Sequence, residues 1–238
     1  MDLLIRIPYT KPDNTGSVLQ IVKSDMTSAL RYMIKENPII AKTSVIAFYI
    51  QISLVPMVIV GVPVLITQHL GYGMDMVGYN QSIMMVGGLV GGILAGALGE
   101  RLKIKYVAIF LFISTLFFGV IGIPFFFPTP AFPAYIIITI ATALALAINQ
   151  LVNIPVFAFI QAETPSDLMG KVMSFFQILP FVAMGSGSLI YGFLYDTFDE
   201  KPWIVIFGTV LITVGIAIYA HKIFKDKQPA SSTKDQRS

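Results

Sequence analysis

The side chains in this sequence that are best suited to bind a small molecule are uncharged amides. Asn149, Gln150 and Asn153 fall within about one turn of a strongly apolar stretch, and Gln51 lies in another such stretch. Residues three or four positions apart share one face of an α-helix. Amides are costly in an apolar environment unless they bond a neighbouring helix or face water. The spacing therefore predicts either hydrogen bonds between helices or the polar wall of a cavity.

The two interpretations differ in how many amides they require. Hydrogen bonds between membrane helices each contribute well under about 2 kcal/mol, and a single amide such as Gln51 fits that role. Three amides within one turn exceed what packing needs. For Asn149, Gln150 and Asn153 we therefore favour a substrate cavity.

The apolar stretches lack the residues that catalysis would require. They contain no interior Asp, Glu, Lys or Arg, which a metal cluster, a carboxylate pair or an activated serine would need. His69 and His221 lie at opposite membrane faces and cannot share a metal ion. The sequence has no cysteine, which excludes thiolate metal sites and cysteine nucleophiles. We predict a protein that is not an enzyme and holds no metal or cofactor.

The elements that carry the amides are predicted to cross a membrane. Of 238 residues, 55% are hydrophobic and only 12% are charged, against roughly 25% charged residues in soluble domains. The charge-free stretches are long enough to span a bilayer, which takes about 20 residues per helix. We predict an all-α membrane protein with six spans. They cover residues 40–67, 77–99, 104–124, 133–161, 168–194 and 202–222.

The basic residues predict the orientation, because positive charge concentrates on the cytoplasmic side of membrane proteins. Lys and Arg gather before the first span, after the second and after the sixth, whereas the opposite loops contain only Lys201. Both termini are therefore predicted to be cytoplasmic, which requires an even number of spans. The net charge of +3 belongs to this pattern and does not indicate a nucleic-acid partner.

The predicted organisation has three parts. Residues 1–38 form a cytoplasmic segment with a short amphipathic helix, capped by Ser24 and ended by Pro38, that lies on the membrane surface or packs on the ends of the spans. Residues 39–222 form the six-helix bundle. Residues 223–238 form a polar tail that we expect to be disordered.

Proline and glycine mark the spans expected to bend or to pack closely. Pro56, Pro155 and Pro180 lie inside the first, fourth and fifth spans, where each frees a backbone carbonyl and permits a bend. Glycines recur every three or four residues over 87–99, and Gly185, Gly187 and Gly192 with two serines form a similar run of small residues over 185–192. Small residues in such runs let helix backbones approach closely. We interpret the prolines as gating positions and the glycines as faces that pack tightly and can slide or rock.

The loop after the second span resembles a known motif. Gly96, Glu100 and Arg101, followed by basic residues, resemble the cytoplasmic loop motif of the major facilitator superfamily. That motif has a Gly, three residues, an acid, a base, and then Gly and further basic residues. Lys103 stands where the family usually has its second glycine. Residues 163–172, with the glycine-rich fifth span, are similar to the family's loop between its tenth and eleventh helices.

This resemblance implies a fold and a function. Such transporters have two six-helix halves with the binding site between them, and this chain looks like a C-terminal half. It is most similar to the drug and macrolide efflux proteins of the cell membrane. In the family pattern the first and fourth spans face the central cavity, which makes Gln51 a substrate-binding candidate beside the three amides of the fourth span. The implied partners are a small-molecule substrate, the lipid bilayer, and an N-terminal half or a second copy.

The resemblance also implies gating roles. In the family the loop motif acts as a latch that favours one access state, so Gly96, Glu100 and Arg101 are gating candidates. We expect Glu100 to lie near the positive end of the fifth helix, and Arg101 to pair with Glu163 or Asp167. The alternative class of protein is a non-transporting six-helix subunit or a truncated remnant.

Overall fold

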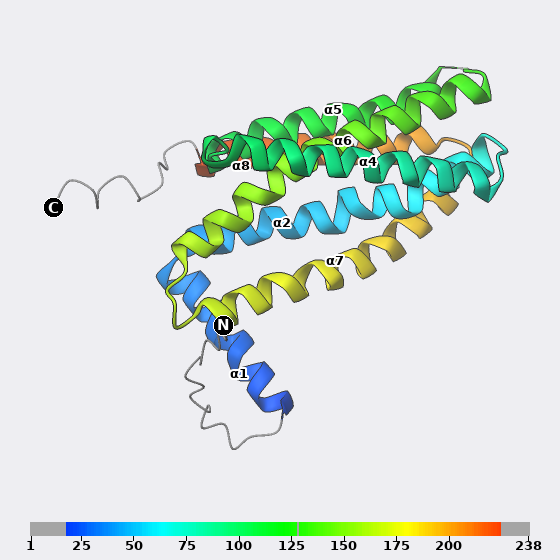
Figure 1. The fold of residues 1–238 in the computed structure, drawn as a ribbon. Helices are drawn as coiled ribbons and strands as arrows, with labels where there is room; N and C mark the ends of the chain where they lie inside the picture. The colour runs from blue at the N-terminus through cyan, green and yellow to red at the C-terminus, as the bar shows by residue number, and fades with distance from the viewer. Residues whose placement is uncertain (1–17, 128, 225–238) are drawn as a thin grey trace, which may run out of the picture.

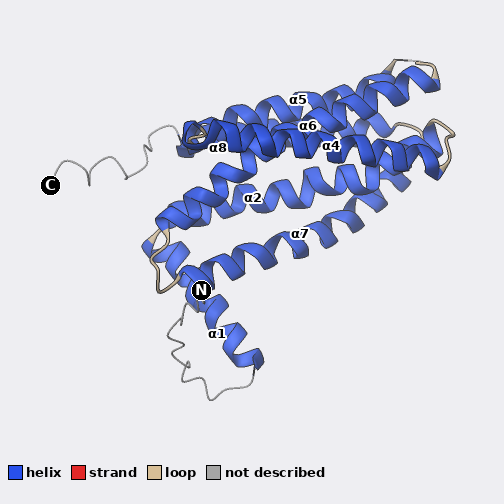
Figure 2. Ribbon diagram, in the orientation of Figure 1, coloured by secondary structure: helices blue, strands red, loops and turns tan. Residues whose placement is uncertain are grey.

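A computed structural model describes residues 18–127 and 129–224, and its secondary structure in these ranges is entirely helical (Figure 2). The α-helices are α1 (Val18–Arg31), α2 (Pro38–Pro56), α3 (Val62–Val64), α4 (Met74–Leu98), α5 (Val107–Phe126), α6 (Ala131–Glu163), α7 (Met169–Thr197) and α8 (Pro202–Phe224). The expected tail from residue 225 onward lies outside the described residues. The start of the predicted tail needs correction, because α8 continues to Phe224.

Six helical segments in these ranges are long and apolar enough to cross a membrane, which confirms the predicted fold class. Each agrees with a predicted span to within a few residues at both ends. The spans are Pro38–His69, Met74–Leu98, Ile104–Phe126, Ala131–Glu163, Met169–Thr197 and Pro202–Phe224.

The spans form one bundle that has two parts. α6 packs on both α4 and α5, α5 packs on α8, and α2 pairs with α7. Smaller contacts of α2 with α8 and α6 join the two parts. Figure 1 shows the start of α2, the α4–α5 connection, the α6–α7 connection and the end of α8 at the same end of the bundle. This arrangement follows from six antiparallel crossings joined by short loops.

The first span is interrupted where the sequence predicts it. α2 ends at Pro56 and is followed by the π-helical turn Met57–Gly61, by α3, and by a second π-helical turn, Leu65–His69. Pro56 has no N–H to donate to the carbonyl oxygen of Ile52, so the regular hydrogen-bond ladder is broken there. Single π-helical turns within α-helices often occur at functional sites.

The helix before the first span begins earlier than predicted. α1 starts by Val18, so Ser24 lies inside it and is not its N-cap. The carbonyl oxygen of Ser24 accepts a hydrogen bond from the Ser28 hydroxyl at 2.8 Å. In the sequence, apolar residues also occur at positions 18, 19, 21 and 22, before Met26, where the predicted apolar pattern began. The helical segment ends at Glu36, and Asn37 is not helical, because the residue before a proline is disfavoured in helical conformation.

α1 and the turn after it contact the ends of the spans. α1 packs against α7, and the π-helical turn Tyr32–Glu36 leads into α2. The Tyr32 hydroxyl donates to the carbonyl oxygen of Glu163 at 3.1 Å. The segment is therefore joined to the last turn of α6 and to α7, at the end of the bundle where Figure 1 shows α1.

Candidate functional site

The amides of the fourth span lie together on α6. The Asn153 side chain donates to Oδ1 of Asn149 at 2.6 Å. Asn149 is buried, whereas Asn153 and Gln150 are half-buried. Gln51 is half-buried in α2, a helix that makes only small contacts with α6. The structure brings the α6 amides together, and the described residues include no hydrogen bond from Gln51 to any of them.

Another amide shows how two helices of this bundle are joined. Asn80 of α4 is 1% exposed. Its amide group donates to the hydroxyls of Thr139 at 3.1 Å and Thr142 at 3.3 Å, both on α6. Asn80 therefore connects α4 to α6, whereas the bond between Asn149 and Asn153 stays within one helix.

The three gating prolines occupy different settings. Pro56 is buried and ends α2, Pro155 is buried inside α6, and Pro180 is half-buried inside α7. α6 and α7 continue as α-helices through their prolines, so among the three prolines only Pro56 lies at a change of helix type. Figure 1 shows α6 curving in its C-terminal part toward the start of α7.

The loop motif begins at the end of α4. Gly99 follows the helix with φ +45°, a left-handed conformation that favours glycine, and residues Gly99–Arg101 form one 3-10 turn. Gly96 is exposed, and no other part of the described chain lies within 4 Å of the position a side-chain carbon would take. The side chain of Glu100 lies outside the described part of the structure, so the expected contact with the start of α7 stays a prediction.

Arg101, expected to pair with Glu163 or Asp167, is exposed. Within the described residues it has no salt bridge to either carboxylate. The amide of Asn37 instead lies 3.4 Å from both the carboxylate Oε2 and the carbonyl oxygen of Glu163. The segment that precedes α2 therefore occupies the end of α6 that the sequence assigned to Arg101.

The glycine spacing of α4 brings this helix against α6. A side-chain carbon added at Gly87 or Gly91 would overlap the backbone of Ala143 or Ala147. Gly92 and Gly96 have open space around the equivalent position. Part of the predicted glycine face is thus packed, and the rest contacts no described residue.

α7 approaches α2 closely at Gly187. A side-chain carbon at this position would overlap the carbonyl oxygen of Ile52 and lie 2.6 Å from Cγ of Pro56. Ile52 carries the carbonyl group that Pro56, four residues later, cannot bond. The close approach of α7 therefore falls where α2 is interrupted.

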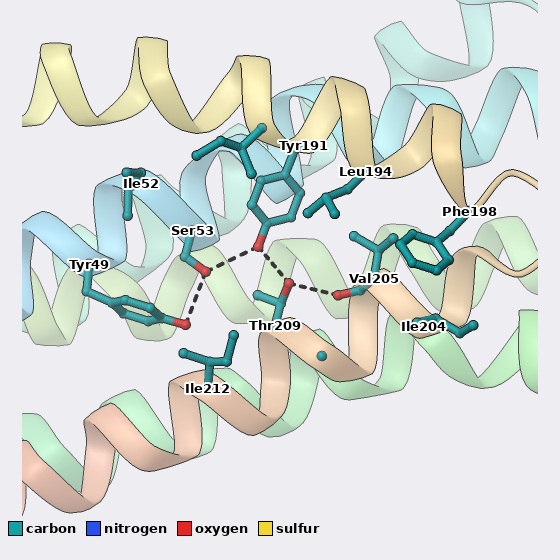
Figure 3. Close-up of a pocket in the computed structure, with 12 residues that line it drawn as sticks. Tyr49, Ile52, Ser53, Tyr191, Leu194, Phe198, Ile204, Val205, Thr209 and Ile212 are labelled. Carbon is teal, nitrogen blue, oxygen red and sulfur yellow. Dashed lines mark hydrogen bonds between the residues drawn. The ribbon is translucent and has the colours of Figure 1, made fainter.

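A cavity of about 330 Å³ lies between α2, α7 and α8 (Figure 3). Its walls are mainly apolar, and its polar atoms are the hydroxyls of Tyr49, Ser53, Tyr191 and Thr209. None of the predicted site residues lines it. None of these four residues was assigned to a site from the sequence, because isolated hydroxyls in apolar helices commonly bond their own backbone. The four-residue spacing of Tyr49 and Ser53 was the available signal.

Comparison with known proteins agrees with this architecture. Six apolar spans joined by short loops, with amides and prolines at depth, define a multi-pass membrane protein. The sequence matches the family described as Major Facilitator Superfamily over residues 3–180, well over half of the chain. The chain belongs to the major facilitator superfamily and is a membrane transporter, a class that is generally not enzymatic. No curated protein and no solved structure matches it.

Proposed function

We propose that this chain is the C-terminal half of a major facilitator exporter that moves a small amphiphilic compound, of the drug or macrolide kind, by alternating access. The observation that carries this proposal is the pair formed by Asn149 and Asn153. Its recorded hydrogen bond lies within α6, so the pair does not serve the helix-joining role that Asn80 has. Asn153 and Gln150 remain partly exposed on the same helix.

The chemistry of the spans favours a neutral or weakly polar substrate. A binding site that is mostly apolar, with a few placed polar groups, orients an amphiphile and buries its apolar part. Asn149, Gln150, Asn153 and Gln51 supply amide donors and acceptors without charge. A sugar phosphate would require fixed basic residues, and the interiors of the spans contain none.

The uneven burial of the spans supports a partner half. Of the most apolar 18 residues of each span, only 17% are buried in α4 and 22% in α7, compared with 33–44% in the other spans. Both carry glycines with open space around them, such as Gly92 and Gly185. An N-terminal half, or a second copy of the chain, would cover these faces and rock against them.

Topology and gating complete the proposal. The protein resides in the plasma membrane with both termini in the cytoplasm, so that the segment before α2 and the segment after α8 flank the bundle on the cytoplasmic side. The loop residues Gly96, Glu100 and Arg101 act as the latch of one access state. Pro56, Pro155 and Pro180 let the spans bend as that state changes, and the π-helical turn after Pro56 supports such a role for the first span.

The test is efflux of lipophilic dyes and macrolides from cells that make this chain alone, or this chain with a separately supplied N-terminal half from a related transporter. Efflux only with the partner half is the expected result. Efflux by the chain alone would make it a working homodimer. No efflux in either case, with the protein present in the membrane, would favour the non-transporting subunit or remnant.

A further inference from the structure

We propose that the cavity between α2, α7 and α8 is a lateral binding site for a neutral, membrane-soluble alcohol. This inference concerns a second site, and it does not depend on which compound the transporter moves. The cavity is lined by Ser53 and Tyr191, and the α6 amides are not among its lining residues. A ligand could therefore occupy it without displacing a substrate held by Asn149 and Asn153.

The cavity lies at membrane depth and opens sideways. Thr209 is seven residues beyond Pro202, where α8 begins, and at 1.5 Å per residue this is about 10 Å along the helix. Figure 3 looks into the cavity between α7 and α8, where the lining residues Ile190 and Ile212 are 48% and 60% exposed. A molecule dissolved in the bilayer can therefore reach the cavity between these two helices.

A connected chain of hydroxyl groups forms the polar side of the cavity. Six hydrogen-bonding contacts of 2.6–3.2 Å link these groups to one another or to backbone carbonyls. Each hydroxyl has one proton to donate and two lone pairs that accept. Five protons therefore serve six contacts, and one contact lacks a proton. The hydroxyls belong to Tyr49, Ser53, Tyr191, Thr209 and Thr213.

The contact that lacks a proton is one of the two made by the Tyr191 hydroxyl. Thr209 donates to the carbonyl oxygen of Val205 at 2.8 Å, and Ser53 donates to the Tyr49 hydroxyl at 3.2 Å. The single proton of Tyr191 then serves either Oγ1 of Thr209 at 2.6 Å or Oγ of Ser53 at 3.2 Å. The shorter contact favours Thr209, which leaves Oγ of Ser53 as an acceptor without a donor.

This pattern selects the chemistry of the ligand. Oγ of Ser53 can accept a further hydrogen bond, and an alcohol supplies the donor together with an apolar body for the walls of Ile52, Leu194 and Ile212. A carboxylate or phosphate would bring further lone pairs to an acceptor-rich surface. A cation would find no carboxylate among the lining residues. The volume is at the lower end of the 300–1,000 Å³ typical of ligand pockets, which favours a small molecule.

Photolabelling with a diazirine derivative of decanol tests the site in the full chain reconstituted in nanodiscs. Decanol and decyl methyl ether serve as competitors at equal membrane concentration, because the ether has the same chain but no proton to donate. We expect label on the lining segments of α7 and α8, and roughly three- to tenfold stronger competition by decanol. Equal competition by the two compounds would overturn the proposal.

Two variants and a matched control locate the effect. Gly208 lines the cavity, and no atom lies within 4 Å of the Cβ that a larger residue would add, so Gly208→Leu is chosen to narrow the cavity. Gly215→Leu is the matched control, since Gly215 has the same open space on α8 and does not line the cavity. Labelling should fall at least fivefold in Gly208→Leu alone. Ser53→Ala should retain labelling but lose the preference for decanol. Unchanged labelling of Gly208→Leu, or an unchanged preference in Ser53→Ala, would contradict the assignment.

Discussion

Tyr191 and Tyr195 lie one turn apart on α7 and differ in how their hydroxyls are satisfied. Tyr191 contacts the hydroxyls of Ser53 and Thr209. Tyr195 is 2% exposed, packs against Gly61, and its hydroxyl has no hydrogen-bond partner in the described part of the chain. An unsatisfied buried polar group costs about 1–3 kcal/mol, whereas a satisfied hydrogen bond stabilises by about 1 kcal/mol.

Replacing each tyrosine by phenylalanine should therefore have opposite effects on stability. We expect Tyr195→Phe to raise the free energy of unfolding by about 1 kcal/mol, and Tyr191→Phe to lower it by about 1 kcal/mol. Thermal unfolding of the two purified variants in detergent, measured against the unaltered chain, gives the sign. A lower melting temperature for Tyr195→Phe than for Tyr191→Phe would contradict the difference that we draw between these hydroxyls.

The asparagines allow a second contrast, between a pair proposed to bind substrate and one that joins two helices. If Asn149 and Asn153 line a substrate cavity, replacing both with Ala should reduce transport about tenfold or more while membrane abundance stays nearly unchanged. Asn80→Ala removes two hydrogen bonds between α4 and α6, so it should lower stability by about 1–2 kcal/mol and reduce abundance. Efflux rates normalised to immunoblot signal separate the two effects. Loss of abundance in the Asn149 and Asn153 variant would support a packing role instead.

The sequence predicted the cluster of amides on α6, but it did not predict which residues from distant parts of the chain contact each other. The four-residue spacing of Asn149 and Asn153 placed them on one face, and the structure has them hydrogen-bonded. Arg101 shows the limit, because the end of α6 is contacted by Asn37 and Tyr32 from a segment far away in the sequence. Which residue reaches a helix end depends on the packing of whole helices, which local spacing does not determine.

At the scale of the elements, Gly187 sets how closely α7 packs on α2. Gly187→Ala must push the helices apart, because the added carbon would overlap the carbonyl oxygen of Ile52. We expect a loss of about 1–3 kcal/mol of stability. Gly185→Ala is the control, since open space surrounds Gly185, and the change should be neutral or stabilising by a few tenths of a kcal/mol. Melting temperatures of the two variants decide the matter. Equal stability would mean that α7 does not approach α2 at this point.

The helices themselves were largely predictable, because length, apolar composition and interrupting prolines are local properties. The span limits agree closely with those read from the sequence. The sequence did not predict that the first span contains two π-helical turns. Pro56 predicts an interruption but not the hydrogen-bond pattern that the backbone adopts around it. The early start of α1 was missed because the prediction relied on Ser24 as a cap, and this helix begins before that residue.

At the scale of the whole molecule, the least buried spans predict where a partner sits. Leu89 on α4 and Leu189 on α7 are 66% and 78% exposed, and Leu211 on α8 is 73% exposed. Exposure in one bundle does not distinguish a surface that meets lipid from one that meets protein. A partner half would cover the exposed faces of α4 and α7 and would leave Leu211 of α8 in contact with lipid.

The chain has no cysteine, so a nitroxide spin label can be placed at any one of these three positions through a single introduced cysteine. Oxygen dissolves in lipid, and its collisions with the label report contact with the bilayer. With an N-terminal half bound, we expect oxygen accessibility to fall several-fold at positions 89 and 189 and to stay high at 211. Protection at 89 and 189 in the chain alone would indicate a second copy on the same faces. High accessibility at all three positions in an efflux-competent complex would place α4 and α7 in lipid and remove the burial argument for a two-half transporter.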